Sequence, residues 1–318
     1  MTARWCEELK KGSNGERDLT ILDNYELREL LFGCRPLLRL KIKGLGEIRM
    51  KRLIMGMLVA GVALSGMCET WKPKLALQLY SFRNMSFVDA VKTAKKIGFE
   101  YVEAYPGQKL GGDMTGNTQF SMDQATRDQI KAFLKEQNIK MVNYGVCSAK
   151  DEAGWKQLFA FAKEMGIETL QVEVGKSDKD MELLSTLSKE TGIKVALHNH
   201  KQPAGFPDAM AAVLAKYPTI GAGADIGHWI NAGKPALEGI KKLEGRITTL
   251  HLVDVASLDA KGRVVPYGKG CADLSKVMDE LKRQKFNGVL TCEYEHMSDK
   301  LVDEVAECVK WYNDYLAK

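Results

Sequence analysis

The sequence predicts an α/β fold, a single closed (β/α)8 (TIM) barrel over residues 73–318, preceded by a signal-peptide-like segment. From residue 74 the chain alternates short β-type runs with amphipathic helical stretches, giving eight strand-helix units in about 245 residues. A barrel of this kind usually has ~250 residues. The alternative, an open doubly wound sheet, would normally carry a Gly-rich phosphate turn after its first strand, and LQLYSFRNMSF has none.

The expected strands are short apolar runs, and helical stretches such as TRDQIKAFLKEQN and WKQLFAFAKEMG repeat apolar residues every three or four positions. The eight runs are KLALQLY (74–80), FEYVEAY (99–105), IKMVNYG (139–145), IETLQVEV (167–174), IKVALHN (193–199), TIGAGAD (219–225), RITTLHLV (246–253) and NGVLTCEY (287–294). Active sites of this fold gather at the carboxyl ends of the strands.

Polar side chains end most of these runs, and all five histidines fall between positions 198 and 296. Helix caps favour Ser, Thr, Asn and Asp, so a row of His and Glu at strand ends indicates a metal or substrate site. The candidates are Gln78, Tyr80, Glu103, Asn143, Glu173, His198, His200, Asp225, His228, His251, Asp254, Glu293 and Glu295.

A set of ordered motifs lies on the same strands. They are GADIGHW (223–229), LHLVDV (250–255), PYGKG (266–270) and GVLTCEYE (288–295). With this order and spacing, residues 74–318 resemble the xylose isomerase-like barrel superfamily. That group includes metal-dependent sugar epimerases, inosose dehydratase-like enzymes and the type IV apurinic endonucleases of the AP endonuclease 2 family.

The resemblance implies a divalent metal cofactor, for which Mn, Mg, Co and Zn all suit mixed His/carboxylate ligands. In the epimerase branch a Glu, an Asp, a His and a Glu follow strands five to eight. The last three correspond to Asp225, His251 and Glu293. At the first position this chain has His198 instead of Glu, so the fourth ligand is either Glu173, which is slightly favoured, or His198.

This chain departs from many relatives at a second position, where Val253 replaces Lys. The resemblance also implies roles for the other candidates. Glu173 and Glu293 are the expected bases, and three histidines are expected to move protons. These are His198, His200 and His228, the last corresponding to a histidine that contacts substrate in the epimerases. The expected substrate-binding residues are Tyr80, Glu103, Asn143, Asp254 and Glu295.

Such a site supports enolisation next to a carbonyl, because a divalent ion chelated by vicinal sugar oxygens stabilises an enediolate. The predicted function is a sugar isomerase or epimerase. The alternatives are a keto-glycoside lyase or hydratase and a non-catalytic sugar-binding barrel. A phosphodiesterase like the apurinic endonucleases is disfavoured, since those hold three metals with more than five histidines.

Charge and cysteine content limit the partners. Residues 1–52 hold 12 Lys+Arg and 8 Asp+Glu, whereas the remainder holds 34 and 33. A near-neutral body argues against a nucleic-acid partner. Cysteines of the predicted barrel show no CxxC spacing, which disfavours a zinc knuckle or thioredoxin-type site. The expected partner is a small-molecule sugar, and a homo-oligomer is compatible with this sequence.

The N-terminal region predicts that the protein is exported, either as a periplasmic protein or as a membrane-anchored lipoprotein. Residues 1–49 are expected to be an upstream or disordered extension, and residues 50–68 a signal peptide with a basic MKR start and an apolar core at 53–64. That core is shorter than the ~20 residues of a membrane span. Cys68 is the candidate lipid anchor, the only membrane contact expected. Export favours unphosphorylated sugars as substrates. A cytoplasmic location is the alternative, and it would make sugar phosphates candidate substrates again.

If translation begins at Met50, the mature protein should begin between Ser65 and Glu69 and lack residues 1–49. N-terminal sequencing of native material measures this. Recovery of the full-length chain from the cytosol would contradict the export prediction.

Overall fold

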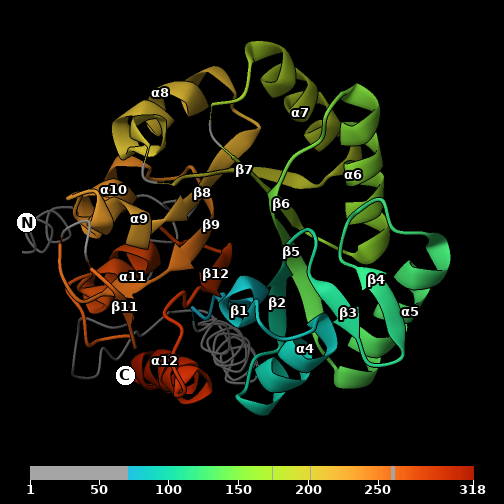
Figure 1. The fold of residues 1–318 in the computed structure, drawn as a ribbon. Helices are drawn as coiled ribbons and strands as arrows, with labels where there is room; N and C mark the ends of the chain where they lie inside the picture. Colours follow the sequence, from blue (N-terminus) through green and yellow to red (C-terminus); the bar gives the residue numbers. More distant parts are fainter. Residues whose placement is uncertain (1–70, 174, 201, 259–261) are drawn as a thin grey trace, which may run out of the picture. The chain divides into compact units, whose positions relative to one another are not determined.

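The computed structural model describes residues 71–173, 175–200, 202–258 and 262–318 and confirms the predicted barrel. Eight parallel strands close in the order β1-β12-β9-β8-β7-β6-β5-β2, with the helices outside the ring (Figure 1). The strands are β1 Lys74–Gln78, β2 Tyr101–Ala104, β5 Lys140–Cys147, β6 Thr169–Glu173, β7 Lys194–His198, β8 Ile220–Asp225, β9 Ile247–Leu252 and β12 Val289–Cys292. Seven of them lie within one predicted run each, and β5 begins in the run 139–145 but extends two residues beyond it.

The helices begin and end at residues whose local chemistry favours those positions. Asp123, Asp151 and Ser177 each accept a hydrogen bond from a backbone N–H of the first turn that follows. Gly166 and Gly192 end two helices in the left-handed conformation. The helices are α4 Phe87–Lys96, α5 Gln124–Gln137, α6 Glu152–Met165, α7 Asp178–Thr191, α8 Pro207–Lys216, α9 Ile226–Asn231, α10 Ala236–Lys242, α11 Leu274–Arg283 and α12 Leu301–Leu316.

Several short elements follow the carboxyl ends of the barrel strands, and the sequence periodicity did not predict them. An antiparallel hairpin, β3 Lys109–Gly111 with β4 Met114–Asn117, follows β2. A second pair, β10 Asp254–Val255 with β11 Val264–Val265, follows β9. The 3₁₀ turns are η1 Leu79–Phe82 and η2 Pro203–Gly205. Pieces of two to four residues are too short for an alternating pattern to be recognised.

Hydrogen bonds to the Asp254 side chain hold the PYGKG segment (266–270) in place. This buried carboxylate accepts backbone N–H groups of Val255, Gly268, Gly270 and Ala272 at 2.8–3.1 Å. A Cβ at Gly270 would lie 2.2 Å from Asp254 Oδ1, so only glycine permits this close approach. Asp254, predicted to bind substrate, is thus placed as the anchor of a loop.

The barrel interior changes from apolar to polar along its axis. Ala76, Val142 and Val289 form a small separate apolar cluster. Side chains two residues further along a strand share its face, and there the interior holds Gln78 and Thr291, both buried. The same polar layer includes Glu103, Asn143, Gln171, Thr249 and His251, all buried. A polar layer therefore lies between the apolar floor and the mouth.

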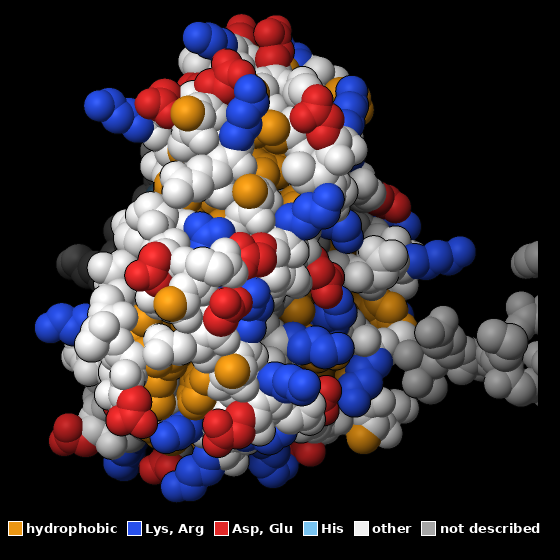
Figure 2. Space-filling view, turned by 90° about the vertical axis from the view of Figure 1, so that its right-hand side faces the viewer, with side chains coloured by type: hydrophobic (Ala, Val, Ile, Leu, Met, Phe, Trp, Pro, Cys, Tyr) orange, Lys and Arg blue, Asp and Glu red, His pale blue; other side chains and the backbone are white. Residues whose placement is uncertain are grey.

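The outer surface carries both signs of charge. On the face seen in Figure 2, Lys and Arg side chains are interspersed with Asp and Glu. No helix in the described ranges is both long and apolar enough to cross a membrane. The predicted extension (1–49), the signal segment (50–68) and Cys68 lie outside the described residues.

Candidate functional site

A cavity of about 310 Å³ opens at the carboxyl ends of the strands, where the fold places active sites. A volume of this order suits a small-molecule ligand. Its described lining residues are Gln78, Tyr80, Tyr105, Pro106, Gly145, Val146, His198, His200, His228, His251, Glu293 and Glu295. Four of the five histidines therefore meet in one pocket, as strand-end positions predict.

Three of the predicted metal ligands converge at one side of this pocket. Nδ1 of His251 lies 2.8 Å from Glu293 Oε2 and 3.6 Å from Asp225 Oδ2. Asp225 Oδ1 accepts the backbone N–H of His228 at 2.9 Å and so caps α9. The second carboxylate oxygen of Asp225 remains directed to the imidazoles.

The other nitrogen of His251 faces the polar layer. Nε2 lies 3.1 Å from Oε1 of Glu103, and the side-chain amide of Gln171 lies 2.7 Å from the same nitrogen. Glu103 also accepts hydrogen bonds from four other side chains, those of Gln78, Asn143, Gln171 and Thr291. Glu103 is fully buried and is absent from the described pocket lining.

This position differs from the one expected of a substrate-binding residue. Glu103 and Asn143 were predicted to contact sugar, yet both are fully buried beneath the pocket. Glu103 instead holds His251 so that Nδ1 points to the mouth. Histidines that bind metals usually donate their second N–H to a carboxylate in this way.

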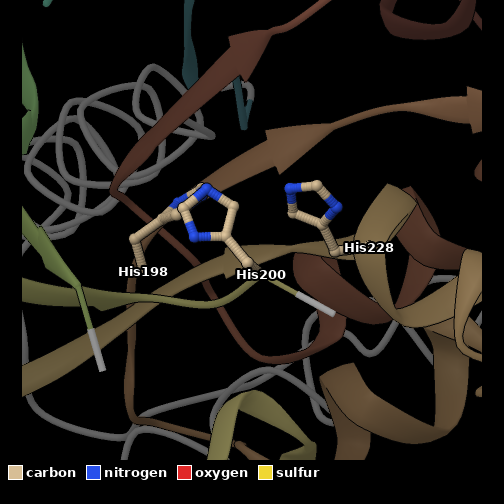
Figure 3. A group of neighbouring side chains, drawn as sticks. All are labelled: His198, His200 and His228. Atoms are coloured by element: carbon tan, nitrogen blue, oxygen red, sulfur yellow. The ribbon is translucent and has the colours of Figure 1, made fainter. Parts of the chain in front are cut away.

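A second group of donors lies beside the first. The rings of His198, His200 and His228 gather at one place, His198 and His200 from the end of β7 and His228 from α9 (Figure 3). One ring nitrogen from each lies within 4.8 Å of the others. Nδ1 of His198 is buried and has no hydrogen-bond partner among the described residues.

Glu173 lies on the histidine side of the pocket. Its Oε2 is 2.7 Å from Nδ1 of His200, and its Oε1 accepts a hydrogen bond from Gln202. The donor groups in the described chain that could hold an ion are His198–His200–His228 and His198–Asp225–His251, and neither includes Glu173 or Glu293. Glu173 thus pairs with His200 in this structure.

Neighbouring charges set the protonation states. Burial and the charge of His251 hold the pKa of His198 well below its usual value, so this imidazole is neutral. Burial alone would raise the pKa of Asp225, but His228, His251 and His198 lower it, so this carboxylate is ionised. Neutral imidazole and ionised carboxylate are the forms that bind metal ions.

The pKa of His251 moves the opposite way. Burial favours the neutral ring, but Glu103 and Glu293 raise its pKa well above the usual value. A proton on Nδ1 of His251 compensates the negative charge of the surrounding carboxylates, and a divalent ion bound there would displace this proton. The donor atoms of His198, Asp225 and His251 lie within 4.8 Å of one another, with Glu293 against His251, so these residues fit a divalent metal.

Other predicted residues line the pocket, and some lining residues were not predicted. Tyr80 and Glu295 belong to the lining, whereas Asp254 does not. Tyr105, which lines the pocket, and Gln171, which is buried beside His251, are not among the predicted residues. Gln171 could have been found, because it precedes Glu173 by two positions and therefore shares its strand face.

Comparison with known proteins agrees with this architecture. Residues 91–315 match the xylose isomerase-like TIM barrel family. The chain belongs to this family. No curated protein matches it.

Solved structures share the fold over most of the chain. An uncharacterised protein from Parabacteroides distasonis is 28% identical, with a TM-score of 0.63 over 76% of this chain and 98% of its own. A D-tagatose 3-epimerase-like protein is 15% identical, with a TM-score of 0.58 over 77% and 98%. The IolI protein, described with a bound zinc atom, is 18% identical, with a TM-score of 0.57 over 77% and 98%.

The contact between Glu103 and His251 makes Glu103 a positioning residue, so Glu103→Gln should weaken divalent metal binding by about 10–100-fold. Calorimetric titration with Mn²⁺ measures this. Thr291→Val is the matched control, because it removes another hydrogen bond of Glu103 and leaves His251 in place. Equal affinities of Glu103→Gln and the unaltered protein would contradict this role.

Proposed function

We propose that the protein is a divalent-metal-dependent sugar isomerase or epimerase that acts by enolisation next to the carbonyl of an unphosphorylated (keto) sugar. One observation carries the proposal. The described pocket lining combines four histidines with Glu293 and Glu295 and contains neither Lys nor Arg. Phosphate groups are normally bound by Arg or Lys, so this lining suits a neutral polyol. An exported enzyme would meet such sugars.

The carboxylate side of the pocket is the proposed metal site. Asp225, His251 and Glu293 would hold the ion, and three protein ligands leave positions open for substrate oxygens. When bound, the ion acts as a Lewis acid that stabilises the negative charge developing on the sugar oxygens. Glu173, the slightly favoured fourth ligand, is engaged by His200, so His198 is the better supported fourth donor.

Proton transfer is assigned to groups on two sides of the pocket. Burial raises the pKa of Glu293, although His251 opposes the shift, and a raised pKa suits a carboxylate base. On the other side, the hydrogen bond from His200 to Glu173 raises the pKa of His200. A protonated His200 held by Glu173 is a suitable acid for the oxygen or carbon of the enolised sugar. His228, which also lines the pocket, is assigned as a second proton donor.

The rim offers an aromatic surface for the sugar. Tyr80 and Tyr105 pack edge to face with ring centroids 5.1 Å apart, and the guanidinium of Arg83 lies 4.9 Å from the Tyr80 centroid. Tyr80 remains partly exposed and lines the pocket. We assign it to substrate contact, with Glu295 available to accept hydroxyl protons.

The histidine side favours one alternative, a keto-glycoside lyase or hydratase. β-Elimination needs a base at the carbon and an acid for the departing glycosidic oxygen. Glu293 and the His200–Glu173 pair supply such a base and acid from different sides of one pocket. A sugar-binding barrel without catalysis is the remaining alternative.

A metal-loaded sample should convert an unphosphorylated ketose or a keto-glucoside, and chelation should stop the reaction. Product analysis by NMR separates an epimer or isomer from a released aglycone. A faster reaction with the phosphorylated ketose would contradict the proposed substrate class, and binding without turnover of every sugar would support the non-catalytic alternative.

Asp225→Asn in the same assay should reduce turnover to the level of the chelated protein. Asn keeps an oxygen to cap α9 through the His228 N–H, so the fold should persist in circular dichroism. Asp208→Asn is the matched control, since Asp208 is an exposed carboxylate paired with Lys242. Full activity of Asp225→Asn with stoichiometric metal would remove Asp225 from the site.

A further inference from the structure

We propose that the amino-terminal face of the barrel, at the end opposite the pocket, is a docking surface for an anionic phospholipid membrane. This face is formed where the chain leaves each helix and enters the next barrel strand. The segment before β1 and the end of α12 belong to it, because the Tyr312 hydroxyl donates to the Pro73 carbonyl. The nine segments are 71–74, 94–101, 135–140, 163–169, 189–194, 214–220, 240–247, 281–289 and 314–318.

Positive charge is concentrated on this face. The nine segments contain 17 Lys and Arg but only 7 Asp and Glu, whereas the rest of residues 71–318 contains 17 and 25. A body that is almost neutral in total therefore has a strongly basic amino-terminal face, and the remainder has an excess of negative charge. A protein with this asymmetry is attracted to an anionic surface by one end.

The positive side chains of the face are available to a partner. Of the 17, 15 are exposed, and 14 have no carboxylate within 4.0 Å among the described residues. The large apolar side chains that the described chain exposes all lie outside the nine segments. Contact with a membrane would therefore be electrostatic, without insertion into the acyl chains. The three paired cations are Lys74, Lys242 and Arg283.

Helix stability accounts for only some of these charges. Lys and Arg in the last turn of a helix interact favourably with the helix dipole, but the effect is lost beyond that turn. Lys140 and Lys194 begin the strands β5 and β7, and Lys285 lies two residues beyond the end of α11. All three are exposed. Because parallel strands begin at the same end of the barrel, these lysines add charge to the face without stabilising a helix.

The chain enters the barrel at this same face. The indole N–H of Trp71 donates a hydrogen bond to the backbone carbonyl of Phe286 at 2.7 Å, shortly before β12 begins. Cys68, the predicted lipid anchor, precedes Trp71 by three positions, which span at most about 11 Å. This reach is comparable to the Debye length of ~8 Å at physiological ionic strength. A lipid on Cys68 would therefore hold the basic face against the bilayer.

The distribution of charge fits a membrane better than a nucleic acid. Each of the nine segments contributes at least one Lys or Arg, so the positive charge surrounds the barrel axis. Proteins that bind single-stranded nucleic acid use a basic groove that follows the backbone, whereas a bilayer presents anionic head groups over a whole surface. With the amino-terminal face on the membrane, the pocket at the other end stays open to small molecules in solution.

The test is cosedimentation of the full chain with vesicles of phosphatidylcholine, with and without phosphatidylglycerol. The measured quantity is the ratio of the two affinities, which separates charge-dependent binding from other contacts. The variant Lys140→Gln/Lys194→Gln/Lys285→Gln removes three cations of the face. Since each lysine near an anionic surface contributes about fivefold to binding, the ratio should fall about 100-fold.

The matched control removes the same charge from the carboxyl side of the barrel. In Lys109→Gln/Lys150→Gln/Lys300→Gln the three lysines are also exposed, and they lie in segments that follow strands. Its affinity ratio should equal that of the unaltered chain. An equal fall in both triple variants, or no fall in the first, overturns the proposal.

Two further measurements identify the partner and separate docking from catalysis. Tighter binding of the unaltered chain to duplex DNA than to the anionic vesicles, lost in the first variant, would assign the face to nucleic acid and overturn the membrane partner. Sugar turnover should be the same in both variants, because none of the six lysines belongs to the described pocket lining. Vesicle binding as expected without any sugar turnover would refute the proposed function alone.

Discussion

The structure depends on one imidazole that joins the sealed interior of the barrel to its open mouth. His251 meets Glu103 through Nε2 and faces Asp225 and Glu293 through Nδ1. Glu103 is fully buried and is contacted by five polar side chains, so its carboxyl group is held in a single arrangement. Removing one partner of a buried polar network leaves the others without compensation, which costs free energy. The orientation of His251 is therefore strongly specified.

Two chemically different sides face the pocket above this layer. Asp225 and Glu293 make one side rich in carboxylates, and three histidines with Glu173 make the other. The departure at His198 from the epimerase pattern produces this asymmetry, because an imidazole stands where a carboxylate ligand is usual. A site with carboxylate and imidazole sides is suited to removing a proton on one side and delivering one on the other.

The barrel and most of the pocket could be predicted because they follow strict periodicities. Strand-helix alternation locates all eight barrel strands, and strand ends locate the four pocket histidines. The depth of a polar side chain could not be predicted, since it depends on the shear of the closed sheet. Strand-end position alone places Glu103 and Asn143 at the mouth, but both lie beneath it. Asp254 anchors a loop through contacts with residues 14 to 18 positions away, which local pattern does not reveal.

Solvent deuterium exchange tests metal-dependent enolisation most directly. Metal-loaded protein is incubated in D₂O with an unphosphorylated ketose or keto-glucoside, and mass spectrometry with NMR locates deuterium in recovered substrate and product. We predict deuterium at the carbon next to the carbonyl, lost after chelation and in Glu293→Gln. Product that forms without deuterium at that carbon, or exchange that continues without metal, would contradict the account.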